Sequence, residues 1–283
     1  MAYPLTSETG NLTCATSSTD LNQLFTNALR MTTDLATINI EAGEIDVTQA
    51  TGSAINMGEM IGGLRTGTVE FGGIYPRATT PLATSSQITY ASGYVQYVNA
   101  WNIDITWPEI DITTINSATV PTWRRWMPGG IGSWSGSYTC KADDTTPPVV
   151  PPTGASAAAT FQFAASGTPA LAGNITTPRL AQRVRLGDYS EITYNFRGSG
   201  DLTQTVSAAY PGLTRATTGA ISKPSWDSAG NNGVPDVSCV LQVATGRTWT
   251  FPAFWTRLNL AWRVDDVVRV TGTLRIADTA VVA

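Results

Sequence analysis

One stretch of this 283-residue chain occurs twice, and this repeat constrains the possible fold more than any other feature. Residues 38–48 read INIEAGEIDVT and residues 103–113 read IDITWPEIDIT, an offset of 65 positions. Downstream, the MIGGL of residues 60–64 is matched by the MPGGI of residues 127–131, an offset of 67 positions. Because the matched pieces keep the same order, the sequence predicts a duplicated folding unit.

A second pair of matching segments lies later in the chain, at an offset of 78 positions. Residues 186–197 read LGDYSEITYNFR and residues 264–275 read VDDVVRVTGTLR, with apolar residues at matching places. Two early segments are thus followed by two late ones, so the copies are not in simple tandem. Two arrangements stay open: one copy inserted into the other, and two copies that exchange strands. We expect a discontinuous first domain of residues 1–85 and 205–283, and a second domain of residues 86–204.

Residues 101–113 alternate apolar and polar side chains with the period of two that a half-buried strand requires. Pro108 cannot donate to a strand ladder and predicts a break in this segment. Residues 186–197 and 264–276 alternate similarly, and threonine, which favours strands, occurs 43 times. The side chains expected on the apolar face of the first segment are Trp101, Ile103, Ile105 and Trp107.

One short helix is predicted near the N-terminus, over residues 20–29. Its apolar residues recur with helical spacing, and Asp20 can cap the helix with Gln23 three positions on. Glycine and proline mark loops elsewhere. The main loop candidates are residues 72–73, 129–130, the proline-rich run 145–159, and 227–235.

The composition excludes several classes of function. Charged residues make up 13% of the chain, against roughly 25% in ordinary soluble domains, and the net charge is −4. An acidic chain of this kind lacks the basic stripe expected of a nucleic-acid binder. Histidine is absent, which removes the Ser-His and Cys-His nucleophile pairs and the usual zinc ligand. No cofactor and no metal site are therefore expected.

The three cysteines are Cys14, Cys140 and Cys239, and their wide spacing indicates neither a disulfide framework nor a metal knuckle. We expect free buried thiols in a reducing cytosol. The N-terminal residues lack the pattern of a signal peptide, and no run approaches the ~18 apolar residues that span a bilayer. The sequence predicts a soluble protein made in a cytoplasm, without contact with membrane.

Residues 98–140, VNAWNIDITWPEIDITTINSATVPTWRRWMPGGIGSWSGSYTC, resemble the signature of the major tail tube proteins of long, non-contractile phage tails. In that family an alternating strand with an acidic turn precedes a Trp-Arg segment, a Pro-Gly turn and a Ser-Trp-Ser-Gly-Ser strand. The late segments resemble the family's closing strand. Here the matching elements are Glu109–Thr114, Trp123–Arg124, Pro128–Ile131 and Ser133–Ser137.

The chain departs from the family pattern in two ways. The proline-rich run replaces the helix that the family carries after its Ser-Trp-Ser-Gly-Ser strand, and most family members have a single copy of the domain. The resemblance implies a mainly β fold with two related β-sandwich or β-barrel-like domains, in addition to the short packed helix near the N-terminus.

The resemblance also implies a non-enzymatic virion protein, assembled in the host cytoplasm, whose stacked rings form the hollow tail tube that conducts phage DNA. In the family six domains line each ring. With two domains per chain, three chains would close a ring with pseudo-sixfold symmetry. The implied partners are other copies of the chain, other tail proteins and DNA that passes without specific binding. Residues 72–86 and 145–159 are candidates for ring-to-ring contacts.

A DNA conduit should carry charge of the same sign as DNA, so the repeated acids are the candidates for the channel wall. These acids are Glu44, Asp46, Glu109 and Asp111. Solvated residues at a strand end are an equally good interpretation. The candidates for subunit contacts are Trp123, Arg124, Trp126 and Trp134. Tryptophans of this kind also occur as core residues, and exposed ones bind sugars by stacking.

Two other functions stay open at the level of sequence. Glu109 and Asp111 lie at i and i+2 of a strand, roughly 6.5 to 7 Å apart by strand rise, which approaches the carboxylate separation of inverting glycosidases. Both copies of the repeat carry that pair on an alternating strand without a second cluster to define a cleft, which disfavours an enzyme. The stronger alternative is a β-sandwich module that binds glycans or a receptor.

Overall fold

The computed structural model describes the part of the chain that forms β-structure and its nearest turns. The described residues are 11–16, 32–46, 60–74, 86–91, 93–95, 97–113, 123–141, 155–163, 170–184, 189–205, 219–221, 237–244, 246–264 and 266–283. These residues form strands and no helix, so the prediction of a mainly β fold is confirmed. The predicted helix at 20–29, the loop 227–235 and residues 145–154 of the proline-rich run lie outside the described residues. The loop predicted at residues 72–73 is wrong, because both glycines are paired within β3 (Met60–Ile74), and residues 157–159 of the proline-rich run belong to β10 (Ala157–Gln162).

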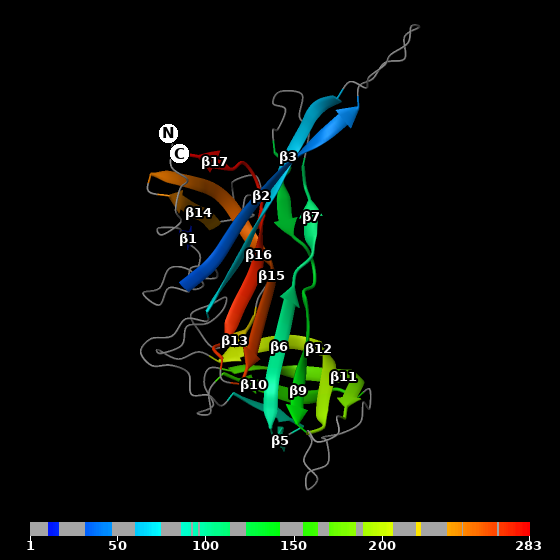
Figure 1. Cartoon of the computed structure of the whole chain (residues 1–283). Helices are drawn as coiled ribbons and strands as arrows, with labels where there is room; N and C mark the ends of the chain where they lie inside the picture. Colours follow the sequence, from blue (N-terminus) through cyan, green and yellow to red (C-terminus); the bar gives the residue numbers. More distant parts are fainter. Residues whose placement is uncertain are drawn as a thin grey trace, which may run out of the picture.

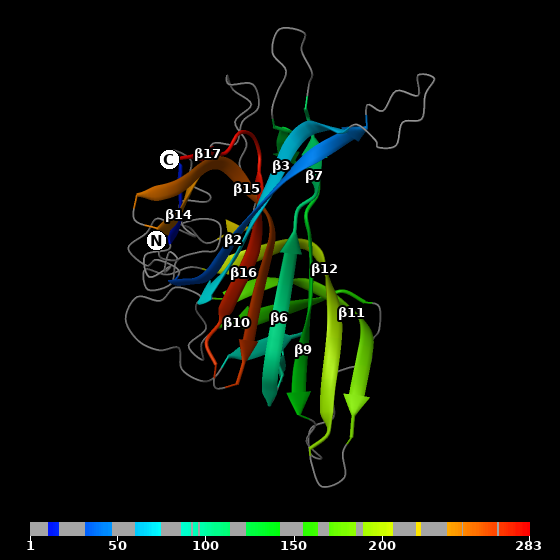
Figure 2. The ribbon, with the colours of Figure 1, turned by 45° about the horizontal axis from the view of Figure 1, so that its top comes forward.

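Eight strands form the main part of a large antiparallel sheet, with β2 and β11 at opposite sides (Figures 1 and 2). Sequence neighbours are not always sheet neighbours, because the C-terminal strands return between the two early hairpins. In order across the sheet the strands are β2 (Thr32–Asp46), β3 (Met60–Ile74), β16 (Arg269–Ile276), β15 (Arg247–Arg263), β6 (Val98–Thr106), β9 (Ser133–Lys141), β12 (Glu191–Thr205) and β11 (Ala170–Arg183).

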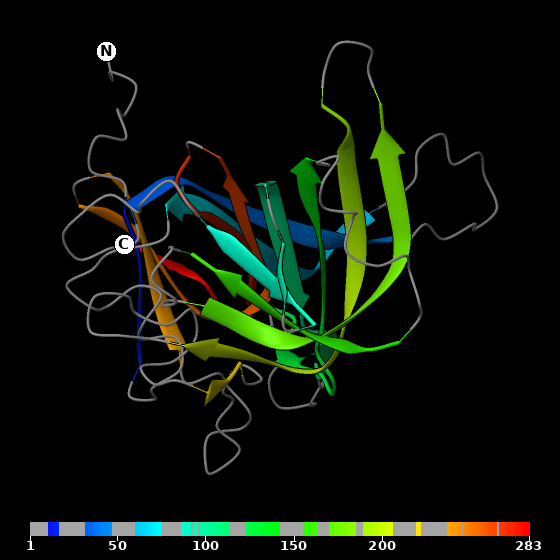
Figure 3. The same cartoon turned by 90° about the horizontal axis from the view of Figure 1, so that it is seen from below.

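Shorter strands form a second layer, which Figure 3 shows crossing the main sheet, so the fold is β-sandwich-like. One group is built on β15: β14 (Val237–Ala244) and β17 (Val281–Val282) pair with β15, and β1 (Asn11–Thr16) pairs with β14. The other group continues from β11 and β12: β10 (Ala157–Gln162), β4 (Gln87–Tyr90), β5 (Gly93–Val95) and β13 (Gly219–Ala220). The long strands β11 and β15 join the two layers.

The apolar face of the main sheet packs under this second layer. On β6 the side chains of Trp101, Ile103 and Ile105 are buried as the alternation predicts. Aromatic rings join the layers, since Phe161 of β10 lies 6.0 Å from the Trp101 ring and 5.1 Å from the Phe196 ring. Burial of such large side chains is the main favourable term in the stability of the fold.

The break predicted at Pro108 is also present. Strand β6 ends at Thr106, and after Trp107 and Pro108 the chain resumes as β7 (Glu109–Asp111). Strand β7 pairs only with β8 (Trp126–Pro128), in a two-stranded sheet separate from the main one. The interruption therefore lets one hairpin contribute to two sheets.

The registers of the ladders recur at constant offsets along the main sheet. The β2–β3 pairs have counterparts in β6–β9 at offsets of 65 and 67 positions, the same as the offsets of the sequence repeat. The β3–β16 pairs have counterparts in β9–β12 at offsets of 67 and 78. The matching pairs are Ile38↔Val69 with Ile103↔Gly136, Val69↔Leu274 with Gly136↔Phe196, and Phe71↔Gly272 with Tyr138↔Tyr194.

A β-bulge recurs at the same place in the β15–β16 and β11–β12 ladders, with an offset of 78 positions on both strands. In each ladder, β15 or β11 has one residue more than its partner strand between two matched pairs. These pairs are Phe254↔Arg275 and Arg257↔Thr273 in the first ladder, and Thr176↔Arg197 and Arg179↔Asn195 in the second. A bulge bends the strand that carries it, which fits strands that pass from one layer to the other.

The cysteines differ from expectation in one respect. Cys140 is free and buried, as predicted, but Cys239 is disulfide-bonded, so the prediction of free thiols is wrong there. The β1–β14 register places the backbones of Cys14 and Cys239 directly opposite each other. Spacing along the sequence could not reveal this, because the two strands come from opposite ends of the chain.

The first prediction concerns Gly198 of β12, which lies against the indole of Trp134. A Cβ atom at Gly198 would lie 2.0 Å from a ring atom of Trp134, whereas one at Gly62 would meet nothing within 4 Å. We expect Gly198→Ala to lower the free energy of unfolding by about 1–3 kcal/mol through overpacking, and Gly62→Ala to change it little. Urea denaturation measures both; equal effects would contradict the packing described here.

The second prediction concerns Tyr194, whose buried hydroxyl has no hydrogen-bond partner among the described residues. Burial raises the pKa of Tyr194 to about 12. A raised pKa means that folding favours the neutral phenol of Tyr194. The fold has its full stability below the pKa of tyrosine in the unfolded chain, about 10, and loses stability as the pH rises from there toward the folded value. We expect Tyr194→Phe to be neutral or stabilising at about pH 7 and to reduce the loss of stability toward about pH 11.

Denaturation of both forms at the two pH values measures the effect of Tyr194→Phe. The control is Tyr97→Phe, because the Tyr97 side chain is 57% exposed. A steep alkaline loss that is the same in wild type and Tyr194→Phe would show that another group is responsible.

Candidate functional site

The face of the main sheet opposite the core is polar and mixed in charge. Small hydroxyl and amide side chains dominate it, and they pair across strands: Asn102 Oδ1 accepts a 2.6 Å hydrogen bond from the Ser137 amide. The hydroxyls of Thr139 and Thr193 lie 3.0 Å apart. Charged residues of both signs are interspersed, so the described face is not uniformly acidic. They include Glu41, Glu70, Asp104, Glu191, Arg179, Arg183, Arg197, Arg257 and Arg269.

A hollow of about 440 Å³ lies on this polar face over β3, β16 and β15. Polar side chains such as Glu70, Arg257 and Thr273 line it. The described residues include no group of three or more histidine, cysteine, aspartate or glutamate side chains that could hold a metal ion. The hollow therefore has a polar lining but no metal-ligating cluster among those residues.

The junction of β15 with β6 joins the two halves of the sheet. Its register places Leu258 opposite Ile105 and Leu260 opposite Ile103, and all four side chains are buried. On the polar side, Arg257 Nε and Nη2 donate hydrogen bonds of 2.8 and 2.9 Å to the two carboxylate oxygens of Asp104. The junction thus combines a ladder, an apolar contact and a two-point ion pair.

The two outer strands of the main sheet each leave one edge without a described partner. Among the described strands, β2 pairs with β3 alone. Strand β11 pairs with β10 over Ala170–Ile175, but beyond that point its outer edge has no described partner. Unpaired N–H and C=O groups in a row can accept another strand.

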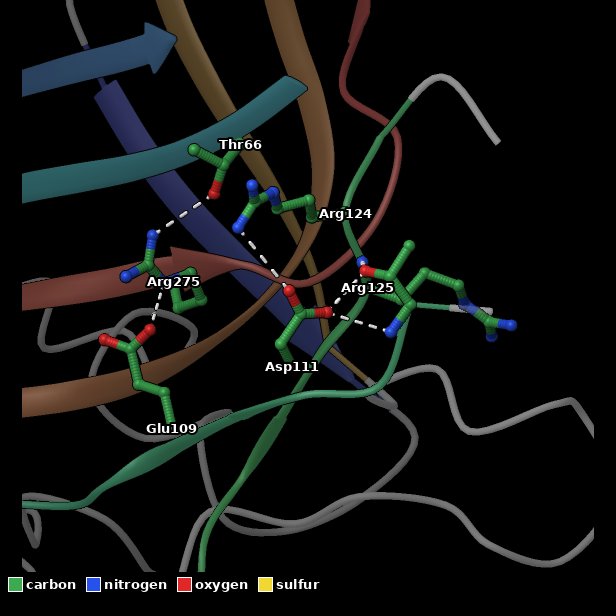
Figure 4. Close-up of polar contacts among 7 residues, drawn as sticks. Thr66, Glu109, Asp111, Arg124, Arg125 and Arg275 are labelled. Carbon is green, nitrogen blue, oxygen red and sulfur yellow. Dashed lines mark hydrogen bonds and ion pairs between the residues drawn. The ribbon is translucent and has the colours of Figure 1, made fainter. Parts of the chain in front are cut away.

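Figure 4 shows the polar contacts at the base of the β7–β8 hairpin, where two of the predicted channel residues lie. The Glu109 carboxylate faces the Arg275 guanidinium of β16 in an ion pair and accepts its hydrogen bond. Arg275 also donates to the Thr66 hydroxyl of β3 at 3.4 Å and lies 4.6 Å from the Trp126 ring centre. Glu109 therefore fastens the hairpin to the main sheet through Arg275.

Asp111 is paired in a similar way at the other end of β7. Its carboxylate lies 3.6 Å from Arg124 and accepts a 2.9 Å hydrogen bond from the Thr113 amide (Figure 4). Burial alone would raise the pKa of Asp111, but the hydrogen bonds from Thr113 and the charge of Arg124 outweigh it and lower that pKa. The carboxylate thus stays charged and held in place.

The other two predicted channel residues lie on β2. Glu44 is exposed and its backbone lies opposite Gly62, while the Asp46 backbone lies opposite Met60. The structure thus places the four acids on two separate hairpins, in pairs that correspond to the repeat. Their assignment to a channel wall stays a prediction.

The predicted subunit-contact residues fall into two groups. Trp123 and Trp134 are 4% and 7% exposed, so they lie in the chain's own core. Trp134 Nε1 donates a 3.0 Å hydrogen bond to the carbonyl oxygen of Gly200. Arg124 is exposed, and Trp126 is half-buried beneath Arg275. Arg124 and Trp126 retain some surface that a neighbouring chain could reach.

Arg124 and Arg125 both pair with acids of their own chain. Besides the Arg124–Asp111 contact, Arg125 lies 3.4 Å from Asp278. The Arg257–Asp104 pair could not be predicted from the sequence, because its two residues are 153 positions apart.

Comparison with protein-family models finds no match to this chain, and comparison with curated proteins finds no significant relative. Among the described residues there is no helix long and apolar enough to cross a membrane.

The third prediction tests the Glu109–Arg275 contact. Both side chains are largely buried, 24% and 18% exposed, so Glu109→Gln leaves a guanidinium without its carboxylate. We expect the free energy of unfolding to fall by about 1–2 kcal/mol. The exchange Glu109→Arg with Arg275→Glu should recover part of this loss, because it restores the opposite charges.

Chemical denaturation of the three proteins measures the effect. Glu70→Gln is the matched control, since Glu70 is exposed on the same face and is expected to change stability by less than about 0.5 kcal/mol. A loss in Glu109→Gln no larger than in Glu70→Gln would count against an anchoring role for the ion pair.

Proposed function

We propose that this chain is a structural protein that polymerises into stacked rings, as the resemblance to phage tail tube proteins implies. In this proposal the assembled rings form the hollow tail tube of a virion, and phage DNA passes through it during ejection. The rings form in the host cytoplasm, from copies of this chain and with other tail proteins at the ends. The chain is not an enzyme and needs no cofactor.

The observation that carries the proposal is the pair of open edges on the main sheet. Outer strand β2 and the second half of β11 expose backbone groups that a neighbouring copy can pair. An antiparallel strand added at such an edge continues the sheet, so copies joined at both edges build a closed or helical assembly. The low charged content, 13%, suits surfaces that are covered by other copies.

The recurring ladder registers support two related units within the chain. One unit would comprise β2, β3, β16 and β15, and the other β6, β9, β12 and β11. Insertion of the second unit into the first then explains the order of the early and late segments. The chain leaves the first unit after β3 and returns to it through β14. Two units per chain favour rings of three chains with pseudo-sixfold symmetry.

The channel proposal needs a refinement. Glu109 and Asp111 are held by arginines, so they contribute less free negative charge than their number suggests. If the polar face of the main sheet lines the channel, the wall presents small hydroxyl and amide groups with charges of both signs. Such a wall lacks the stacking aromatics that hold single-stranded nucleic acid.

The alternative function, a glycan- or receptor-binding module, has less support. Sugar platforms need exposed flat aromatic side chains, but Trp101, Trp123 and Trp134 are buried. The glycosidase alternative is weakened because Glu109 and Asp111 are each paired with an arginine.

The fourth prediction tests assembly directly. We expect the purified chain to form rings or tubes, visible by negative-stain electron microscopy, since the outer edges of its sheet have no partner among the described strands. In dilute solution the smallest stable species should have about three times the chain mass of 30.0 kDa, measured by light scattering after size exclusion.

A chain that stays a monomer at every accessible concentration would contradict self-assembly. A discrete monomer or trimer that never stacks but binds a glycan array would support the alternative module. Six chains per ring in a reconstruction would contradict the pseudo-sixfold trimer while leaving the tube proposal in place.

A further inference from the structure

The internal junction between β15 and β6 supplies a template for contacts between chains. The first half of β15 pairs with β14, and its second half, Arg257–Arg263, pairs with β6. Strand β11 is used in the same way in its first half, which pairs with β10. Its second half, residues 179–183, has the register of residues 257–261 but no described partner in the place of β6.

A counterpart of β6 does exist in the chain, at the far side of the sheet. Strand β2 matches β6 at an offset of 65 positions, and both pair with their hairpin partners in the same register. The outer edge of β2 corresponds to the edge with which β6 pairs to β15. Each chain therefore carries an equivalent of one junction strand at each side of its sheet. Strand β11 is the equivalent of β15, and β2 is the equivalent of β6.

We propose that β11 of one chain pairs antiparallel with β2 of a second copy, in the register of the β15–β6 junction. Each proposed pair follows from an observed pair by subtracting 78 from the residue number on β15 and 65 from the residue number on β6. Arg257↔Thr106 becomes Arg179↔Glu41, Leu258↔Ile105 becomes Leu180↔Ile40, Asn259↔Asp104 becomes Ala181↔Asn39, and Ala261↔Asn102 becomes Arg183↔Thr37. The inference rests on the proposed self-assembly and specifies its interface.

The burial of apolar residues supports this register. At the internal junction Leu258 and Ile105 are 0% and 4% exposed. Their counterparts Leu180 and Ile40 are only partly buried, although both pack against the core. Pairing of the two edges would bring these side chains together and complete their burial, which is favourable in proportion to the apolar area covered.

The charges at the two edges are complementary. Arg179 is exposed on β11 and Glu41 is exposed on β2, and neither has an ion-pair partner among the described residues. The proposed register places them directly opposite, where cross-strand pairs of opposite charge stabilise a sheet. At the internal junction the same side of the ladder holds the Arg257–Asp104 pair. The proposed contact therefore repeats the apolar element of its template, while its charged pair lies directly across the ladder at Arg179 and Glu41, because the counterpart of Asp104 is Asn39.

The edges differ from each other, so the contact is head-to-tail. Each chain offers one β11 edge and one β2 edge, and a head-to-tail contact builds rings where its rotation closes and helical filaments where it does not. The partner that fits both edges is a second copy of this chain.

The fifth prediction tests the register by cross-linking. Asn39→Cys and Ala181→Cys change exposed residues and are made in separate chains, which are then mixed under assembly conditions. A short thiol-reactive cross-linker should join them as a covalent dimer on a denaturing gel, at a yield at least about tenfold above that of each variant alone. Wild-type protein gives the background of the native thiols.

Glu44→Cys mixed with Ala181→Cys is the control for register. Residue 44 lies on the same outer strand but five positions away, roughly 16 Å by strand rise, and should cross-link little. Assemblies in electron micrographs without the Asn39–Ala181 cross-link would overturn the register and leave self-assembly standing. Absence of any assembly in the wild-type chain would overturn the proposed function itself.

A charge exchange gives a second, independent measurement. Arg179→Glu places like charges opposite each other and should raise the concentration needed for assembly by roughly tenfold. Adding Glu41→Arg should restore wild-type assembly. Arg197→Glu is the matched control, because Arg197 is exposed on β12, whose two edges are already paired. An Arg179→Glu chain that assembles like wild type, or a double variant without recovery, would overturn the contact.

Discussion

Backbone hydrogen bonding at the margins of the sheet is the constraint on which the rest of this structure depends. A strand inside a sheet satisfies its N–H and C=O groups on both sides, but an outer strand satisfies only one side. The fold completes most of its margins internally, by adding β14, β1 and β17 to β15 and by adding β10, β4 and β5 to β11. No described strand pairs with the outer edge of β2 or with that of the second half of β11.

The two long strands make this arrangement possible. Strands β11 and β15 each pair with a short strand of the second layer in their first half and belong to the main sheet in their second half. The bulge lies between the two halves in both strands, where the change of direction needs it. The bulge also fixes which side chains of the second half of each strand face the core. It therefore sets the register of every strand that pairs with that second half.

Local patterns predicted much of the fold. Alternation over residues 101–106 identified β6 and its buried face, Pro108 identified the break before β7, and the repeat identified segments that occupy matching places in the ladders. Local patterns could not predict the return of the C-terminal strands between the early hairpins, because such pairing depends on the whole chain. The same reason explains why the disulfide at Cys239 was missed.

The candidate site was predicted less completely than the fold. The acids Glu109 and Asp111 stood out in the sequence, but their partners Arg275 and Arg124 were fixed only by tertiary structure. Likewise, the tryptophan-rich segment was identified, while burial alone separated Trp123 and Trp134 from the more exposed Trp126. Side-chain type thus indicated which residues matter, and packing decided what each of them does.

The nested path of the chain has a consequence for its synthesis on the ribosome. Strand β3 pairs with β16 through contacts such as Val69 with Leu274, residues 205 positions apart, so β3 waits for nearly the whole polypeptide to emerge. Strands β6, β9, β12 and β11 lie within a continuous stretch and can pair earlier. Until the C-terminal strands arrive, the nascent β2–β3 hairpin presents an open margin that invites premature association, and late, long-range pairing of this kind is slow.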